Sequence, residues 1–293
     1  MQTLLIVGCG DIARRTLPYL AGRYRIVALL RDAREAAFWR ARGAFPLLAD
    51  LDRPASLRRV AGLADAVLHF APPTASGPRD VRMRWLLAAL RRGSSLPRRF
   101  VYISSSGVYG DCAGARVAET RPPRPLTARA RRRVDAERQL RRFGRDARVC
   151  VSILRAPGIY AADRLPLDRL RRGWPALREE DDVFTSHIHA DDLARLVCAA
   201  LRRGGPNRVY NAADDSCLKM GDYFDLVADR RGLPRPPRVS RQEAERTLSP
   251  ARFSFMSESR RLDNGRLRRE FGARLRYPVI ADGLDASGAN DPF

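Results

Sequence analysis

The chain opens with Leu4-Leu5-Ile6-Val7-Gly8-Cys9-Gly10-Asp11-Ile12-Ala13, an aliphatic run followed by two glycines and a small residue. Consecutive aliphatic residues that end in glycine are typical of a buried parallel strand. The pattern G-x-G-x-x-A then leads into Asp11–Leu20, which we predict to be a helix. A strand, a glycine turn and a helix in this order indicate a dinucleotide-binding fold with its phosphate loop at residues 8–13.

Each small residue of this loop has a physical role. Gly8 permits the tight turn, Gly10 lets the backbone approach a pyrophosphate, and Ala13 allows close packing of helix on strand. The first helical residues present free N–H groups and the positive end of the helix dipole. We therefore assign Gly8, Gly10, Asp11, Ile12 and Ala13 to cofactor binding. A structural turn without a ligand is the alternative.

Strand-like and helical stretches continue to alternate through the first half of the chain. Such alternation predicts βαβ units and an α/β fold, a Rossmann-type doubly wound parallel sheet. The further strands are expected at Arg25–Leu30, Phe45–Ala49, Ala66–Phe70, Phe100–Ser104 and Val149–Leu154. The helices between them are expected at Ala33–Arg42, Pro54–Ala61, Asp80–Arg92 and Arg129–Phe143.

The second half of the sequence is richer in loops and proline. We predict an NAD(P)-binding Rossmann domain over residues 1–155, completed by about 186–215. Residues 156–185 and 216–284, called the second region below, are expected to form a smaller C-terminal substrate-binding region. The tail, residues 285–293, lacks periodicity and is predicted to be disordered.

The end of the second predicted strand bears on the choice of dinucleotide. An arginine there suits the 2′-phosphate of NADP, and an acidic residue suits the ribose hydroxyl of NAD. Arg31 comes first and Asp32 next, so we favour NADP and keep NAD as the alternative. Asp50 and Leu51 follow the third strand and are placed to contact the edge of the adenine ring of the dinucleotide. The alternative, equally supported, is that Asp50 only precedes a helix.

The fifth predicted strand leads into Val101-Tyr102-Ile103-Ser104-Ser105-Ser106-Gly107-Val108-Tyr109-Gly110. Here the chain resembles the extended short-chain dehydrogenase/reductase superfamily, in its NAD-dependent epimerase/dehydratase branch. Its glycine loop is one residue shorter than the superfamily's usual form, which places it near an atypical group. The other motifs that carry the resemblance are Gly8–Ala13, Ala71-Pro72-Pro73, Leu154–Tyr160, Ile188–Ala194 and Val209-Tyr210-Asn211.

The resemblance implies a catalytic site, and this sequence departs from it at one point. Ser105 takes the position that hydrogen-bonds the substrate oxygen. The positions of the Tyr-x-x-x-Lys pair hold Arg129 and Arg133. Arg133 can still hold the nicotinamide ribose, whereas a guanidinium does not donate a proton near neutral pH. The candidates for the missing acid are Ser105 acting with water, Tyr109 and Tyr160. A structural role is the alternative for each of these residues.

The resemblance also extends the predicted cofactor site to residues far along the chain. Ala71, Pro72 and Pro73 follow the fourth strand, and Pro157 and Gly158 follow the sixth. We expect all five to lie along the bound dinucleotide.

The histidines and arginines in the second half of the chain belong to less specific sequence patterns. We expect no metal site: the run from His187 to Asp192 caps a helix, with Asp191 or Asp192 as the N-cap. Arg164, Arg260 and Arg261 are candidates to meet a carboxylate or phosphate of the substrate. Solvated charges in an arginine-rich chain are the alternative for each of these arginines.

These motifs favour an NAD(P)-dependent oxidoreductase or an epimerase/dehydratase-like enzyme that acts on an unknown small molecule. The arginine at position 129 motivates the alternative, a catalytically degenerate NADP-binding sensor or scaffold protein. Hydride chemistry that depends on Ser105 separates the two hypotheses.

Charge and composition exclude several other classes. The 293 residues carry 55 basic and 33 acidic groups, a formal net charge of +22, and Lys219 is the sole lysine. Arginine spread along the whole chain, without aromatic residues between basic blocks, argues against specific nucleic-acid binding. No apolar run approaches a membrane span. The five cysteines are scattered along the sequence, so we expect them to be reduced thiols and the protein to be cytoplasmic. We expect a monomer or a homodimer.

Overall fold

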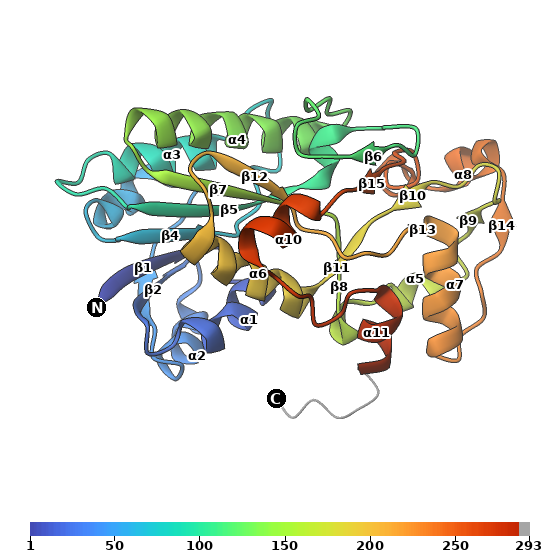
Figure 1. The fold of residues 1–293 in the computed structure, drawn as a ribbon, viewed down its shortest axis with the longest axis horizontal. Helices are drawn as coiled ribbons and strands as arrows, with labels where there is room; N and C mark the ends of the chain where they lie inside the picture. The colour runs from blue at the N-terminus through green and yellow to red at the C-terminus, as the bar shows by residue number, and fades with distance from the viewer. Residues whose placement is uncertain (287–293) are drawn as a thin grey trace.

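The computed structural model describes residues 1–286 and contains a seven-stranded parallel sheet in the order β12-β7-β5-β4-β1-β2-β3 (Figure 1). The order reverses beside β1, so crossovers place helices on both faces, as predicted for a doubly wound fold. The strands are β1 (Gln2–Val7), β2 (Tyr24–Leu30), β3 (Phe45–Leu48), β4 (Ala66–His69), β5 (Arg99–Ser105), β7 (Cys150–Ala156) and β12 (Arg208–Asn211).

Two hydrophobic cores lie on the two faces of this sheet. Alternate residues of each strand point to opposite faces, so Leu4 and Ile6 join one core, and Leu5 and Val7 the other. The first core is covered by α1 (Asp11–Leu20), α2 (Ala36–Arg40), α6 (Ala190–Arg203) and α10 (Gly265–Phe271). The second is covered by α3 (Val81–Leu90), α4 (Ala128–Asp146) and the 3-10 helix η2 (Pro54–Val60).

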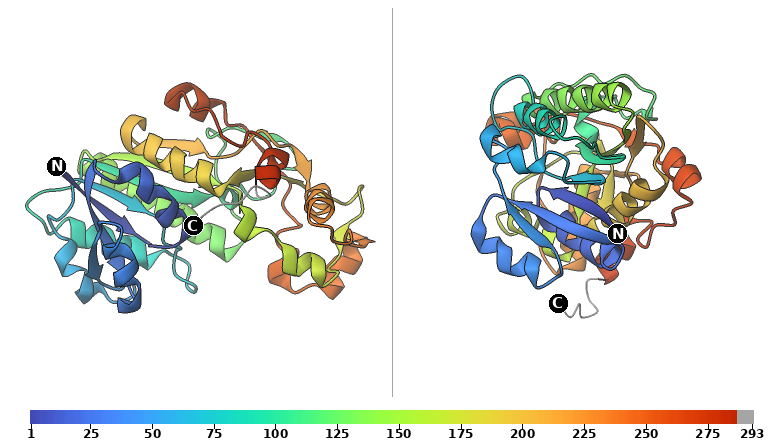
Figure 2. Two further views of the ribbon diagram at one scale, coloured as in Figure 1. Left: turned by 90° about the horizontal axis from the view of Figure 1, so that it is seen from below. Right: turned by 90° about the vertical axis from the view of Figure 1, so that its left-hand side faces the viewer.

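The remaining elements are short and extend beyond the carboxyl ends of the strands, toward one end of the elongated molecule (Figures 1 and 2). The paired short strands are β6 (Arg116–Val117) with β15 (Arg261–Leu262), β8 (Gly158–Tyr160) with β11 (His187–His189), β9 (Ala176–Leu177) with β14 (Arg238–Val239), and β10 (Phe184–Thr185) with β13 (Leu218–Lys219). The helices are η1 (Ala33–Glu35), η3 (Ser106–Tyr109), η4 (Ala162–Arg164), α5 (Leu167–Arg171), α7 (Met220–Arg230), α8 (Arg241–Thr247), α9 (Pro250–Phe253) and α11 (Ile280–Asp285).

Several local predictions differ from the structure. The helix expected at Pro54–Ala61 is the 3-10 helix η2, in which i to i+3 bonds satisfy the backbone of a short connection. The start of the stretch Ala33–Arg42 is the 3-10 helix η1 before α2 begins. Asp285, the first residue of the predicted disordered tail, ends α11, and residues 287–293 lie outside the described residues.

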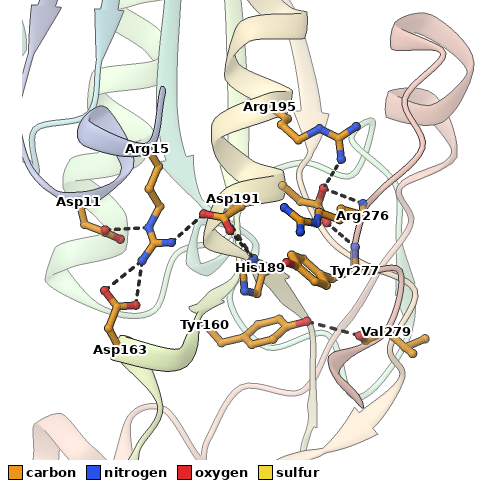
Figure 3. A network of polar contacts seen from close by, with 11 residues as sticks. Asp11, Arg15, Tyr160, Asp163, His189, Asp191, Arg195, Arg276, Tyr277 and Val279 are labelled. Carbon is orange, nitrogen blue, oxygen red and sulfur yellow. Dashed lines mark hydrogen bonds and ion pairs between the residues drawn. The ribbon is translucent and has the colours of Figure 1, made fainter. Parts of the chain in front are cut away.

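The N-cap of α6 is also not the one predicted (Figure 3). His189 Nδ1 accepts a hydrogen bond from the backbone N–H of Asp191 at 3.2 Å. Burial lowers the pKa of His189, which favours a neutral ring with one nitrogen able to accept. Asp192 instead accepts the N–H groups of Arg276 and Tyr277 at 2.8 Å each, so its carboxylate ties the C-terminal segment to α6.

Candidate functional site

The glycine loop has the geometry that a phosphate loop requires. Gly8 has φ of +90°, and a Cβ added there would lie 2.3 Å from the backbone nitrogen of Ala71. Glycine is therefore needed both for the backbone conformation and for the close approach of the β4–α3 connection. At Gly10 an added Cβ would meet nothing within 4 Å, so open space faces the N-terminus of α1.

Asp11 takes part in an ion-pair cluster at the start of α1, which we call the clasp (Figure 3). Arg15 pairs with Asp11 at 2.8 Å, with Asp191 of α6 at 2.7 Å, and with Asp163 of η4 at 2.8 Å. Arg164 pairs with the other carboxylate oxygen of Asp11 at 2.8 Å. Burial alone would raise the pKa of Asp11, but the hydrogen bonds from Arg164 and Arg15 lower it.

The clasp has two consequences. The charge of the Asp11 carboxylate is balanced by two guanidinium groups, beside the helix end where a pyrophosphate would otherwise be repelled. Arg164, predicted as a candidate for substrate binding, lies at the glycine loop instead, and it does not line the cavity described below.

At the carboxyl end of β2, Arg31 is exposed while the neighbouring aspartate is occupied. The Asp32 carboxylate accepts hydrogen bonds from Arg34, from its backbone nitrogen at 2.9 Å and its Nε at 2.8 Å. Arg34 lowers the pKa of Asp32 through these bonds. The carboxylate of Asp32 is therefore paired, whereas the exposed Arg31 has no ion-pair partner among the described residues.

Asp50 and Leu51 lie at the carboxyl end of β3. Asp50 Oδ1 accepts the backbone N–H of Asp52 at 2.9 Å, and the Leu51 side chain is buried in the second core. Arg82 pairs with Asp52 and donates to the backbone oxygen of Pro72 at 3.2 Å. This edge of the sheet therefore brings the predicted adenine-side residues near the β4–α3 connection.

A cavity of about 440 Å³ lies between the carboxyl end of the sheet and the second region. It is lined by Ser105, Arg133, Pro157 and Gly158, which the sequence analysis assigned to the site from three separate parts of the chain. Arg129 lines it as well. The cavity is therefore the place where the predicted catalytic residues meet.

Ser105 ends β5 at the wall of this cavity. Its Oγ accepts the backbone N–H of Gly107 at 3.2 Å. A hydroxyl that accepts one hydrogen bond keeps its own proton to donate. The geometry leaves that proton available to an oxygen atom in the cavity.

Arg133 is held by two acceptors of β5. Its Nη1 donates to the hydroxyl of Tyr102 and to the backbone oxygen of Ile103, both at 2.8 Å. Burial raises the pKa of Tyr102 to about 12, so its hydroxyl is neutral at physiological pH. One end of the guanidinium is thus fixed, and Nε and Nη2 extend the same planar fork at the cavity wall.

Arg129, which the sequence resemblance places at the position of the proton donor, lies on the wall of the cavity. Its guanidinium lies over the ring of Phe255, 4.6 Å from the ring centre. The two tyrosines considered as replacements are engaged elsewhere: Tyr109 donates to Asn211 Oδ1 at 2.8 Å, and Tyr160 donates to the Val279 oxygen at 3.4 Å. Among the described residues, no tyrosine lines the cavity.

A buried ion pair, Glu137 with Arg155, lies next to Ser105 on the sheet side of the cavity. Glu137 of α4 accepts hydrogen bonds from Arg155 at 2.6 and 3.1 Å and from the Ser104 hydroxyl at 2.6 Å. Arg155 also lies over the ring of Tyr109 at 4.6 Å. Burial disfavours the charge of Arg155, but Glu137 raises the pKa of Arg155 above its usual range. This pair fixes α4 against β5 and β7, directly behind Ser105.

The histidines have no metal-binding arrangement. His69 is buried between Phe100 and Tyr102, and burial lowers its pKa to about 3. His187 lines the cavity, packs 4.2 Å from the Tyr223 ring, and has a pKa lowered by burial to about 3. Within residues 1–286, no group of histidine, cysteine and acidic residues can hold a metal ion.

Sequence reasoning missed most of the far wall of the cavity. Arg169 of α5, Arg252 of α9, Phe224 of α7 and Glu258 all line it, and none belongs to a recognisable motif. The candidate substrate arginine Arg260 lines the cavity and pairs with Glu258 at 2.7 Å. Arg261, the other candidate, does not line the cavity, and its Nε donates to the backbone oxygen of Gly114 at 2.6 Å.

Helices that could cross a membrane are absent from the described part of the chain, whose longest helix, α4, is strongly charged.

Comparison with known proteins finds relatives in sequence and in structure. A ketoreductase from Stigmatella aurantiaca, which acts on a farnesylated dihydroquinoline oxide, is 24% identical over 250 residues, 80% of this chain and 74% of the relative. A functionally unknown conserved protein from Silicibacter pomeroyi matches with a TM-score of 0.80 and 31% identity, over 99% of both chains. A dTDP-glucose 4,6-dehydratase from Streptomyces venezuelae, solved with NAD bound, has a TM-score of 0.77 and 20% identity, over 99% and 98% of the chains.

The family model for NAD-dependent epimerases and dehydratases matches residues 4–213. This range includes the glycine loop, Ser105 and the strands of the central sheet. The solved neighbours include epimerases and dehydratases with the same Rossmann-type architecture. The chain is a member of the NAD-dependent epimerase/dehydratase family.

Proposed function

We propose that the protein is an NADP-dependent oxidoreductase that acts on a carbonyl or hydroxyl group of a small molecule. The observation that carries the proposal is the meeting of Ser105, Arg133, Pro157 and Gly158 around one cavity, at the carboxyl edge of the sheet. Ligands of doubly wound folds bind at this edge, where the strand order reverses. The ketoreductase activity of the Stigmatella relative agrees with this reaction class.

The chain's own residues define a path for the dinucleotide. The N-terminus of α1 would receive the pyrophosphate, and the open space at Gly10 and the balanced charge of Asp11 favour it there. Arg31 and Arg34 would meet the 2′-phosphate, which is the basis for preferring NADP to NAD. The bound nicotinamide would supply or accept the hydride.

At the reacting end, Ser105 would donate its proton to the substrate oxygen, and the free side of Arg133 would hold the ribose hydroxyls. A positioned general acid contributes about 10²–10⁴ in rate. With arginine at position 129, we expect turnover well below that of a site with tyrosine. Polarisation of the substrate oxygen by Ser105 and Arg129 is the remaining contribution of the protein.

A second function is supported by the same arginine. A protein that binds NADP without turnover, as a sensor or scaffold, needs no proton donor in the cavity, and the described lining residues include no tyrosine.

Hydride exchange separates the two functions. NADPH with deuterium at the transferable position is incubated with the protein and a panel of ketones and aldehydes, and loss of deuterium is followed by mass spectrometry. The oxidoreductase proposal predicts stereospecific loss that falls at least tenfold in Ser105→Ala. Absence of exchange in the native protein would leave the sensor or scaffold function, whereas equal exchange in Ser105→Ala would contradict the role assigned to Ser105.

We further propose that the protein is cytoplasmic and either monomeric or homodimeric. All five cysteines are free thiols, and Cys217 is exposed, which suits a reducing compartment.

A further inference from the structure

The cavity has a large excess of positive charge. Five arginines line it, namely Arg129, Arg133, Arg169, Arg252 and Arg260, against the carboxylate of Glu258 as the sole acidic group of the described lining. His187 is neutral, because burial lowers its pKa to about 3. Since Glu258 is paired with Arg260, four guanidinium groups remain without a carboxylate partner among the described residues.

Two of these arginines form a pair in the second region. Arg169 comes from α5 and lies over the ring of Phe224, 4.4 Å from its centre. Arg252 comes from α9 and lies over the ring of Trp174 at 3.6 Å. Each guanidinium is thus placed by an aromatic ring, a contact that fixes its plane without neutralising its charge.

The pair is electrostatically unsatisfied. Burial, together with the neighbouring charge of Arg252, lowers the pKa of Arg169 below its usual range. Arg169 Nη2 donates to the backbone oxygen of Pro175, whereas its Nε is buried without a hydrogen-bond partner in the described structure. A buried donor without a partner is costly and is explained by a ligand that supplies the acceptor.

The cavity wall strengthens this requirement. Met220, Phe224 and Phe255 are apolar and lie among the lining residues. Charges interact more strongly beside apolar groups than in bulk water, so both the repulsion of the pair and its attraction for an anion increase.

We propose that Arg169 and Arg252 bind an anionic oxygen group of the substrate, a phosphate or a carboxylate, while Ser105 holds the reacting oxygen from the sheet side of the cavity. The planar forks of two guanidiniums present paired donors that match either group. The proposal rests on the proposed function in one respect, in that it takes the cavity as the substrate site. Binding of the anion alone does not depend on turnover.

The test measures anion binding by thermal unfolding of the full chain. Inorganic phosphate and acetate are titrated against sodium chloride at equal ionic strength, because a chain of charge +22 is stabilised by any anion through screening. The variants are Arg252→Gln, an exposed site whose replacement spares the fold, and Arg169→Gln. The control is Arg171→Gln, on the same helix and outside the cavity.

We expect phosphate or acetate to raise the melting temperature of the native chain and of Arg171→Gln more than chloride does. In Arg252→Gln and Arg169→Gln the apparent affinity should fall at least tenfold. A larger rise in melting temperature with phosphate than with acetate indicates that the substrate carries a phosphate ester. A larger rise with acetate indicates that it carries a carboxylate. The proposal is overturned if neither anion exceeds chloride, or if both variants retain the native response, as they would if phosphate bound at α1.

NADPH titration of the same variants keeps this proposal distinct from the proposed function. Intact NADPH binding with no specific anion response would refute the anion site and leave the oxidoreductase. A specific anion response that both variants lose, without NADPH binding, would refute the oxidoreductase and leave the anion site.

Discussion

Two arginine-rich regions of the molecule are built in opposite ways. In the clasp beside the glycine loop, Arg15 contacts three carboxylates (Figure 3). Arg164 contacts one of the same three, that of Asp11. In the cavity, Arg169 and Arg252 contact aromatic rings and have no carboxylate partner among the described residues. Paired arginines join parts of the fold, whereas cavity-lining arginines without a carboxylate partner are open to an anion. In a chain so rich in arginine, the partners of each residue are therefore more informative than the count.

The largest expected effect comes from the paired class. Glu137→Gln removes the negative charge that neutralises the buried guanidinium of Arg155. Ser104 and Arg155 also lose a charged hydrogen-bond acceptor. Breaking a buried pair from one side costs about 3–5 kcal/mol. Denaturant unfolding should show this loss, while Glu245→Gln, at an exposed position, should change stability by less than about 0.5 kcal/mol. Equal stability of the two variants would contradict the role assigned to the pair.

The next effect concerns the unpaired class. Arg129→Tyr replaces a cavity cation with a proton donor at the position that the superfamily uses, so hydride exchange should rise by about 10²-fold. The rate of deuterium loss from labelled NADPH measures it. Arg131→Tyr, an exposed neighbour on α4, should leave the rate unchanged. If NADPH binds Arg129→Tyr normally and the rate does not rise, position 129 is not the site of proton transfer.

The clasp should contribute a smaller, pH-dependent stability. Arg164 and Arg15 lower the folded pKa of Asp11, so its contribution is present above its unfolded pKa and is lost as pH falls through the folded value. Asp11→Asn should lower stability at pH 7 by about 1 kcal/mol or less, because solvent screens this half-buried pair. Melting temperatures of the native chain and Asp11→Asn should converge below about pH 4, near the usual pKa of aspartate. A gap that persists in acid would exclude the ion pairs as its source.

A third group of arginines, on the outer face of α4, sharpens the comparison. Arg131 and Arg138 are exposed without an ion-pair partner among the described residues, whereas Arg142 pairs with Asp146 at 3.5 Å. The other two acidic residues of α4 are engaged in the interior. Asp135 accepts from Gln139 and from the Asp80 backbone, and Glu137 is buried with Arg155. Like charges oppose pairing of two copies through α4, so light scattering at low salt should give a monomer. A dimer at low salt that contacts through α4 would contradict this reading.

Local sequence signals predicted the elements that depend on local chemistry. Gly8 is required by its own backbone conformation and by the contact with Ala71, and the helix Asp11–Leu20 begins and ends as predicted. The strands were recognisable because both faces of the sheet are buried, which gives continuous aliphatic runs.

The far wall of the cavity could not be predicted, because it depends on long-range packing. Arg169 and Arg252 are 83 positions apart and are brought together by short elements without periodicity. The N-cap of α6 was missed because a neutral buried histidine accepts as well as an aspartate does. Glu137 and Arg155 gave no signal, since charged residues in helices are normally exposed.

The central claim is that the glycine loop and Arg31 bind NADP beside the cavity, and calorimetric titration tests it most directly. NADPH and NADH are titrated into the native chain and into Arg31→Ala. The account predicts tighter binding of NADPH than of NADH, and a selective loss of NADPH affinity of about tenfold in Arg31→Ala, the equivalent of one exposed charge-assisted contact. No binding of either dinucleotide to the native chain would contradict it.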